Sequence, residues 1–154
     1  MAQKLEELHV YQKAMAFWES VNALLQHSGY RKDRKLADQT SDANDSIPAN
    51  VSEGFEQPTD AAFAQYLFHA KGSLGEVLSR LREARLKRYI TQEEVSKRLR
   101  DGESLSRSLG AFIRYLDICG WKDRGRYKSR QRQHGAGTHD PGTHDQGTHD
   151  PGDP

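Results

Sequence analysis

Apolar residues recur every three or four positions along most of the first 118 residues, which is the period of an amphipathic helix. The first such segment predicts a helix over about 5–27. Its apolar stripe consists of Leu8, Tyr11, Met15, Trp18, Val21 or Asn22, and Leu25. Gly29 follows directly and can take the left-handed conformation that ends a helix. A charged connector is expected from Tyr30 to Lys35.

The second segment predicts a helix over about 34–56, although Pro48 lies inside it. One face of this helix holds Thr40, Ala43, Ile47, Asn50 or Val51, and Gly54. Because proline has no backbone N–H, the carbonyl of Asn44 loses its helical partner, and a bend is expected there. The helix should end before Pro58, with Thr59 or Asp60 as the N-cap of the next one.

The third segment, about 60–88, has the most regular pattern in the chain. Its near-heptad stripe, typical of a helix bundle, is formed by Phe63, Leu67, Ala70, Leu74, Val77, Leu81 and Ala84. Gly72 and Gly75 interrupt the helix, each at a cost of about 1 kcal/mol relative to alanine. They predict either a close approach of another helix or simple tolerance of glycine.

The fourth segment, about 92–118, begins with a capping box in which Thr91 and Glu94 bond each other's backbone. Its stripe is Val95, Leu99, Gly102, Leu105, Leu109, Phe112 or Ile113, and Leu116. No segment alternates as a half-buried strand would. Four long helices with short connectors predict an all-α, antiparallel up-down-up-down four-helix bundle.

The helical period stops beyond Trp121. We therefore divide the chain into a bundle at 1–121, a basic arm at 122–132 and a tail at 133–154 that repeats Gly-Thr-His-Asp. The tail has no large apolar residue to bury, so it is expected to be disordered.

Charge is distributed unevenly, although the net value is only +1. The bundle is neutral, the arm carries six basic residues against Asp123, and the tail carries four aspartates without lysine or arginine. The single cysteine, Cys119, excludes an intramolecular disulfide. With neither an apolar leader nor a spanning stretch of roughly 20 residues, a soluble cytoplasmic protein is expected, with no membrane partner.

Asn50 and Glu53 lie one turn apart beside Pro48, followed by Gly54. They predict either buried hydrogen bonds that fix the bundle register or a polar site at a subunit contact. The first reading is favoured, because no second acid or base lies nearby in sequence to complete a reaction.

Basic residues suggest a surface for phosphate groups. The candidates at the end of the third helix are Arg80, Arg82, Arg85, Lys87 and Arg88, extended by Lys97, Arg98 and Arg100. The candidates in the arm are Lys122, Arg124, Arg126, Lys128, Arg130 and Arg132. Such residues bind RNA or DNA backbones by releasing counterions. The alternative is a solvated helix face that partly complements the helix dipole.

No residues predict catalysis or a resident cofactor. His139, His144 and His149, each followed by aspartate, could chelate zinc or nickel, but their flexible spacing offers no preformed geometry, and we expect no metal site. Nucleophile-elbow, P-loop and dinucleotide motifs are absent.

Three motifs carry a family resemblance over roughly residues 5–118. The sequence Leu8-His9-Val10-Tyr11-Gln12-Lys13-Ala14 resembles the "L-x-V-x-Q-K-A" opening of the family first found in intervening sequences of 23S ribosomal RNA genes. Ser46 to Gly54 is similar to its "S-I-P-A-N-I-A-E-G" signature. Residues 63–76 are similar to its "F-x-x-F-L-x-x-A-x-G-S-L-x-E" pattern.

The resemblance implies a left-handed bundle that assembles as a homopentamer, with no established enzymatic activity. Relatives include an accessory protein of diversity-generating retroelements that binds nucleic acid and a reverse transcriptase. The polar residues 40–45 depart from the usual "Q-I-R-R-A-A" and weaken any basic surface there. Two functions stay open: an oligomeric scaffold that binds nucleic acid or a nucleic-acid-processing partner, and a protein–protein interaction ring without a nucleic-acid role.

Overall fold

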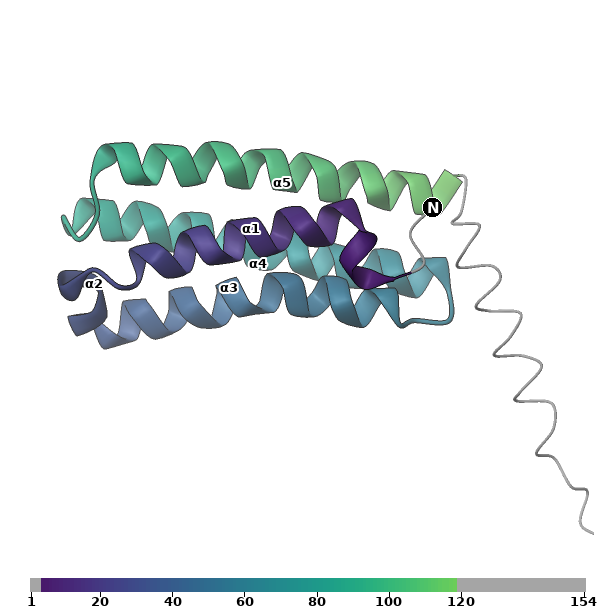
Figure 1. Ribbon diagram of the computed structural model, residues 1–154, viewed down its shortest axis with the longest axis horizontal. Coiled ribbons are helices and arrows are strands. Elements are labelled where there is room, and N and C mark those ends of the chain that lie inside the picture. Colours follow the sequence, from purple (N-terminus) through teal and green to yellow (C-terminus); the bar gives the residue numbers. More distant parts are fainter. Residues whose placement is uncertain (1–3, 119–154) are drawn as a thin grey trace, which may run out of the picture.

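The computed structural model describes residues 4–118, and helices account for nearly all of this range (Figure 1). The elements in chain order are a 3-10 turn at Leu5–Glu7, α1 at His9–Leu24, α2 at Ser28–Lys32, α3 at Arg34–Phe55, α4 at Asp60–Leu86 and α5 at Gln92–Ile118. The described part of the chain contains no strand. None of its helices is long and apolar enough to cross a bilayer.

The four long helices run up and down in turn, as the short connections require (Figure 1). Helix α3 packs against α1 and α4, and α5 packs against α4 and α1, so each long helix touches two others around one core. The predicted antiparallel four-helix bundle is confirmed. The start of α1, the α3–α4 turn and the end of α5 lie at one end of the bundle, while α2 and the α4–α5 connection lie at the other.

Helix α4 buries the stripe that its sequence predicts. All seven stripe residues, from Phe63 to Ala84, are at most 1% exposed. Helix α5 likewise buries most of its predicted positions, with Ile113 rather than Phe112 in the core. The capping box is also confirmed: Thr91 N–H donates to Glu94 Oε2 at 2.8 Å, and Glu94 N–H donates to Thr91 Oγ1 at 3.1 Å.

Helix α1 differs from its prediction in both its start and its buried face. The chain forms a 3-10 turn first, and the α-helix begins only at His9. The buried stripe is Val10, Ala14, Phe17, Val21 and Leu24. Tyr11, Met15 and Trp18, which were predicted to face the core, are only half-buried. Both stripes have helical spacing, and the smaller side chains face the core.

The short helix α2 begins at Ser28 and occupies the first part of the connector expected at residues 30–35. Tyr30 in this helix is fully buried, and its hydroxyl donates to Thr40 Oγ1 at 2.7 Å. Thr40 Oγ1 donates in turn to the Leu36 carbonyl at 2.7 Å. Burial raises the pKa of the Tyr30 phenol, so the neutral form is favoured in the folded protein.

The glycines of α3 and α4 include one at a tight contact between these two helices and two at open positions. A Cβ placed on Gly54 would lie 2.6 Å from Phe63 Cδ2 and 2.9 Å from Tyr66 Cβ, so α3 packs tightly against α4 there. Gly72 and Gly75 face open space, with no atom within 4 Å of such a Cβ. The close contact predicted for these two glycines is therefore not made within the described chain.

Candidate nucleic-acid interface

The signature around Pro48 lies in an unbroken stretch of α3. Asn50 Nδ2 donates to the Ser46 carbonyl at 2.8 Å and to Ser46 Oγ at 2.9 Å. Ser46 Oγ is also 2.8 Å from Ser73 Oγ on α4. These bonds connect the turn before the proline with the turn after it and with the neighbouring helix. Asn50 is thus bonded within α3, and Ser46 links it to α4.

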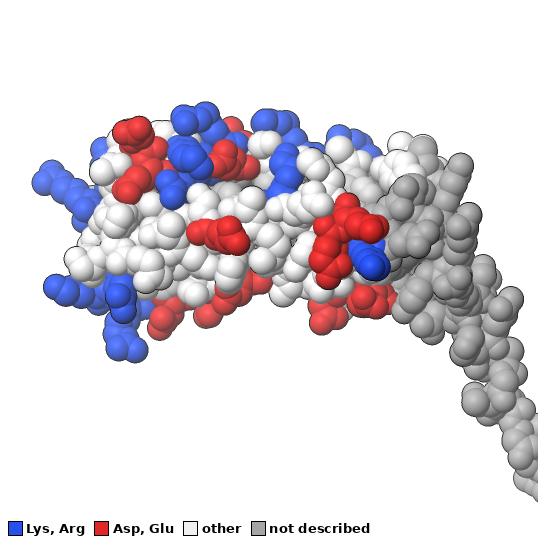
Figure 2. Space-filling view, in the orientation of Figure 1, with Lys and Arg blue, Asp and Glu red and all other residues white. Residues whose placement is uncertain are grey.

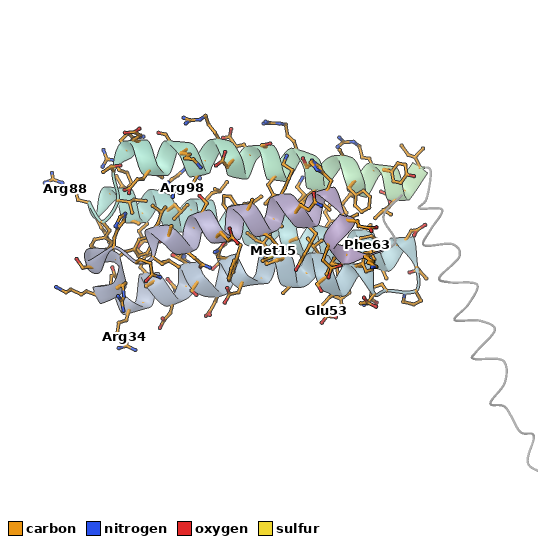
Figure 3. All side chains as sticks on the ribbon, in the orientation of Figure 1. Met15, Arg34, Glu53, Phe63, Arg88 and Arg98 are labelled. Carbon is orange, nitrogen blue, oxygen red and sulfur yellow. The ribbon has the colours of Figure 1, made fainter. Side chains whose placement is uncertain are left out.

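Glu53 does not share that role, because its side chain is exposed. The prediction that Glu53 makes a buried hydrogen bond within the bundle is wrong. Glu53 follows Asn50 by three positions, and its side chain points outward from α3 (Figure 3). Its alternative role at a subunit contact stays a prediction. Gly54, the last residue of the signature, is buried against α4.

The polar residues 40–45 connect α3 to its neighbours. Besides the Tyr30–Thr40 bond, Asn44 Nδ2 donates to the Trp18 carbonyl at 3.0 Å and to Asn22 Oδ1 at 3.2 Å. Trp18 Nε1 donates to Asp45 Oδ1 at 2.7 Å. This segment therefore fixes α1 on α3 and does not form a cationic surface.

The basic residues of α4 fall into two groups. Arg80 is half-buried and pairs with Glu76 at 4.0 Å and with Glu83 at 3.3 Å. Lys87 pairs with Asp33 at 2.9 Å and with Glu83 at 3.4 Å. These two cations are engaged within the bundle and are the poorest candidates for an external phosphate.

The remaining α4 candidates are more available. Arg85 Nε donates to Gln92 Oε1 at 3.0 Å but has no ion pair among the described residues. Arg82 and Arg88 are exposed and take part in no ion pair within residues 4–118. In contrast, Lys97 pairs with Asp101 at 3.0 Å, and Arg98 donates to the Ser20 carbonyl at 3.1 Å.

Sequence reasoning missed the cations at the corner between α2 and α3. Arg31, Lys32, Arg34 and Lys35 are exposed, and none forms an ion pair within the described range. The Asp33–Lys87 pair joins this corner to the end of α4. We refer to one set of residues as the basic end: Arg31, Lys32, Arg34, Lys35, Arg82, Arg85 and Arg88. Their proximity depends on a contact across 54 residues, so no local pattern could reveal it.

The figures show this arrangement directly. Lysine and arginine side chains gather at the end of the bundle where α2 and the α4–α5 connection lie (Figure 2). Arg34 and Arg88 both extend outward from that end, whereas Glu53 lies toward the opposite end (Figure 3). The bundle therefore presents a cationic surface at one of its two ends.

The pKa shifts of Asp33 and Lys87 both favour the charged forms that make their ion pair. The hydrogen bond from Lys87, with further ones from the Leu36 N–H and the Tyr89 hydroxyl, lowers the pKa of Asp33. The hydrogen bond between Lys87 and Asp33 raises the pKa of Lys87. The separate hydrogen bond from the Tyr89 hydroxyl to Asp33 raises the pKa of Tyr89. Asp33 is thus held ionised by groups of the bundle itself, and its charge is offset by Lys87.

The basic arm and the histidine tail lie outside the described residues. This applies to Lys122, Arg124, Arg126, Lys128, Arg130 and Arg132 and to His139, His144 and His149. Ile118, the last described residue of α5, lies at the end of the bundle opposite the basic end (Figure 1).

One cluster has the residue types of a serine–lysine pair but not its chemistry. Lys13 Nζ lies 2.9 Å from Ser104 Oγ, 2.7 Å from Ser108 Oγ and 3.4 Å from the Ser104 carbonyl. Three acceptors suit a charged ammonium with three protons, whereas a general base must be neutral. Backbone N–H groups inside α5 are occupied by the helix and cannot stabilise an oxyanion.

The described residues contain no group of three or more histidine, cysteine, aspartate or glutamate side chains that could hold a metal ion. An apolar groove of about 350 Å³ lies between the start of α1 and the end of α5, and it is lined by Leu8, His9, Val10, Ser108, Ala111, Phe112 and Tyr115. It contains no pair of acid and base groups.

Comparisons with known proteins agree on the fold. Residues 6–111 match the family described as 23S rRNA-intervening sequence protein. A crystal structure of a protein with unknown function from the S23 ribosomal protein family of Bacteroides thetaiotaomicron aligns with a TM-score of 0.62 and 24% identity. The alignment covers 68% of this chain and 97% of that one. No curated protein matches the sequence.

Proposed function

The chain belongs to the 23S rRNA-intervening sequence protein family, and from that premise we propose that it is a non-enzymatic homo-oligomeric scaffold. It binds RNA or DNA, or a partner that processes nucleic acid, through basic surfaces. The family resemblance suggests a pentamer. The family's function is unknown, so the chemistry of this chain's own surface has to support the proposal.

The supporting observation is the set of cations without ion-pair partners at the basic end. Residues 31–35 and 82–88 together hold eight basic residues and only two carboxylates, Asp33 and Glu83. Both carboxylates contact Lys87, so the other cations keep their charge available for a ligand. Exposed, unpaired arginines and lysines are the groups that contact nucleic-acid phosphates.

Assembly would strengthen this surface. One basic end gives a modest field that physiological salt screens over about 8 Å. Several copies in one ring would place several such ends on the same ligand, and avidity rises steeply when sites are linked. The arm at residues 122–132 would add cations from each copy.

A gel-shift titration of the full chain tests nucleic-acid binding. Structured RNA and duplex DNA should both shift at about 50 mM salt, and the affinity should fall steeply at about 200 mM because bound counterions are released. A chain ending at Trp121 measures the part that the arm and tail contribute. Affinity that did not change with salt would contradict an electrostatic mode of binding.

The second candidate function is a protein–protein interaction ring without nucleic acid. It is favoured by Phe68, which is 53% exposed on the outer face of α4 next to Gly72 and Gly75. An exposed aromatic side chain beside an open backbone suits a neighbouring protein surface. Sedimentation of the full chain should give a mass of about five copies on the pentamer proposal. A monomer would rule out both ring proposals.

A further inference from the structure

Arg88 has a backbone conformation that arginine rarely adopts. Its φ is 63°, and among the residues at 4–118 it is the non-glycine residue with positive φ. It follows Lys87, which closes α4 as the C-cap. Tyr89 N–H donates to the Ala84 carbonyl at 3.0 Å, and Arg88 N–H donates to the Arg85 carbonyl at 3.0 Å. These two bonds define a Schellman motif, whose left-handed position normally holds glycine.

The structure gives no internal reason for an arginine at this position. The Arg88 side chain is exposed, makes no hydrogen bond or ion pair with the described residues, and extends away from the bundle (Figure 3). Glycine would make the same two backbone bonds without the steric conflict of a Cβ. A residue held in an unfavourable conformation without an internal contact points to an external role.

The corner between α2 and α3 places further cations beside it. Lys87, the residue before Arg88, is fixed to Asp33 at 2.9 Å. Tyr89, the residue after it, donates to the same carboxylate at 3.0 Å. Asp33 is flanked by Lys32 and Arg34, both exposed and unpaired within the described chain. Arg88 is therefore held between two residues that are both bonded to the centre of the α2–α3 corner.

We infer that the basic end is a composite phosphate-backbone site for nucleic acid, with Arg88 at its tip and the cations of the α2–α3 corner beside it. This inference rests on the proposed function and assigns it to one surface of the bundle. Lys87 and Asp33 position the two halves of the site, while Arg31, Lys32, Arg34, Lys35 and Arg88 contact the ligand.

The site has features that favour nucleic acid over an anionic membrane. Its cations come from two segments, residues 31–35 and 82–88, that meet around the hydrogen-bonded Asp33–Lys87 pair. A fixed array of this kind suits a polymer with regularly spaced phosphates. Among the described residues, the large apolar side chain that is strongly exposed beside the basic end is Leu86, at 79%. Interfacial membrane binding generally needs a continuous apolar face.

The test compares charge variants of the full chain. Fluorescence anisotropy with a labelled duplex DNA and a labelled RNA hairpin gives the affinity at several salt concentrations. R34Q/K35Q should weaken binding about tenfold at low salt and reduce the salt slope by about 2, because roughly one counterion is released per phosphate contact. R107Q/R114Q removes the same charge from exposed positions on α5 and should leave the slope unchanged.

Arg88→Gly gives two readouts that should move in opposite directions. Binding should weaken severalfold, while the melting temperature should rise because glycine relieves the left-handed conformation. Arg88→Lys should keep part of the affinity without raising the melting temperature. A purely structural role for Arg88 would not produce this opposite movement of affinity and stability.

The outcomes separate this inference from the proposed function. Wild-type binding that R34Q/K35Q and R88G leave intact would place the ligand elsewhere, for example on the arm, and overturn the inference alone. Absence of any binding to the DNA or the RNA would overturn the inference together with the nucleic-acid binding in the proposed function. Binding to vesicles of phosphatidylcholine and phosphatidylserine, without binding to nucleic acid, would identify a lipid surface instead and also overturn both.

Discussion

Lys87 Nζ lies 2.9 Å from Asp33 Oδ2, and this pair joins the end of α4 to the start of α3. Asp33 also caps α3, because its Oδ1 accepts the Leu36 N–H at 3.2 Å. The Asp33 carboxylate thus caps the helix that follows the α2–α3 connection and also binds Lys87 at the start of the α4–α5 connection. The geometry makes Asp33 the residue on which the shape of the basic end depends.

Asp33→Asn should lower the melting temperature at neutral pH. Asparagine keeps an oxygen for the Leu36 N–H but loses the charge that attracts Lys87. Because the hydrogen bonds to Asp33 lower its pKa, its contribution is present above the unfolded-state pKa of about 4 and is lost as the pH falls through the lower folded-state value. Thermal melts between neutral and acidic pH should show the two proteins converging. A constant difference across that range would contradict this account.

Gly54→Ala should destabilise the bundle by about 1–3 kcal/mol, because the new Cβ would overlap the Phe63 ring and the Tyr66 Cβ. Gly72→Ala is the matched control, since its Cβ meets open space. It should instead stabilise the isolated subunit by up to about 1 kcal/mol through helix propensity. Urea unfolding measures both. Equal destabilisation by the two substitutions would mean that the α3–α4 contact is not special. Loss of oligomer mass in Gly72→Ala would indicate that another copy packs there.

Asn50→Ala should cost about 1 kcal/mol, because the bonds from its amide to Ser46 are removed. Glu53→Gln should change the stability of the isolated subunit by less than about 0.5 kcal/mol, since Glu53 is exposed. Denaturant unfolding together with sedimentation separates the two roles. A smaller oligomer for Glu53→Gln would support the predicted subunit contact, and unchanged assembly would remove it.

Tyr30→Phe should cost about 1 kcal/mol at neutral pH, because Thr40 loses the hydroxyl that bonds its side chain. Burial raises the folded-state pKa of Tyr30, so its contribution is full below the unfolded-state pKa of about 10 and is lost as the pH rises through the folded-state value. The wild type should therefore lose its advantage over Tyr30→Phe in alkaline solution. A stability difference that grew above that pH would show that Tyr30 is not held neutral.

Much of the bundle follows from local patterns in the sequence. The stripe of α4 was predicted completely because a single set of apolar positions satisfied the helical period. The capping box of α5 was predicted because both partners lie within one turn. The face of α1 was predicted only in part: Leu8, Val21 and Leu25 are buried, but Tyr11, Met15 and Trp18 are not. Two adjacent stripes are both apolar there, and the period alone cannot choose between them. Helix α2 was missed because its core residue, Tyr30, lies among charged residues.

In the candidate site, too, some features follow from the local sequence and others only from the fold. The sequence by itself determined that α4 ends in a run of cations and that an amphipathic four-helix bundle precedes a basic arm, since these properties depend on neighbours in the chain. Only the tertiary structure decided which cations are free. It paired Arg80 and Lys87 with carboxylates and left Arg88 exposed. It also brought the α2–α3 corner beside the end of α4, because ion pairing and packing act over distances in space that the order of residues does not contain.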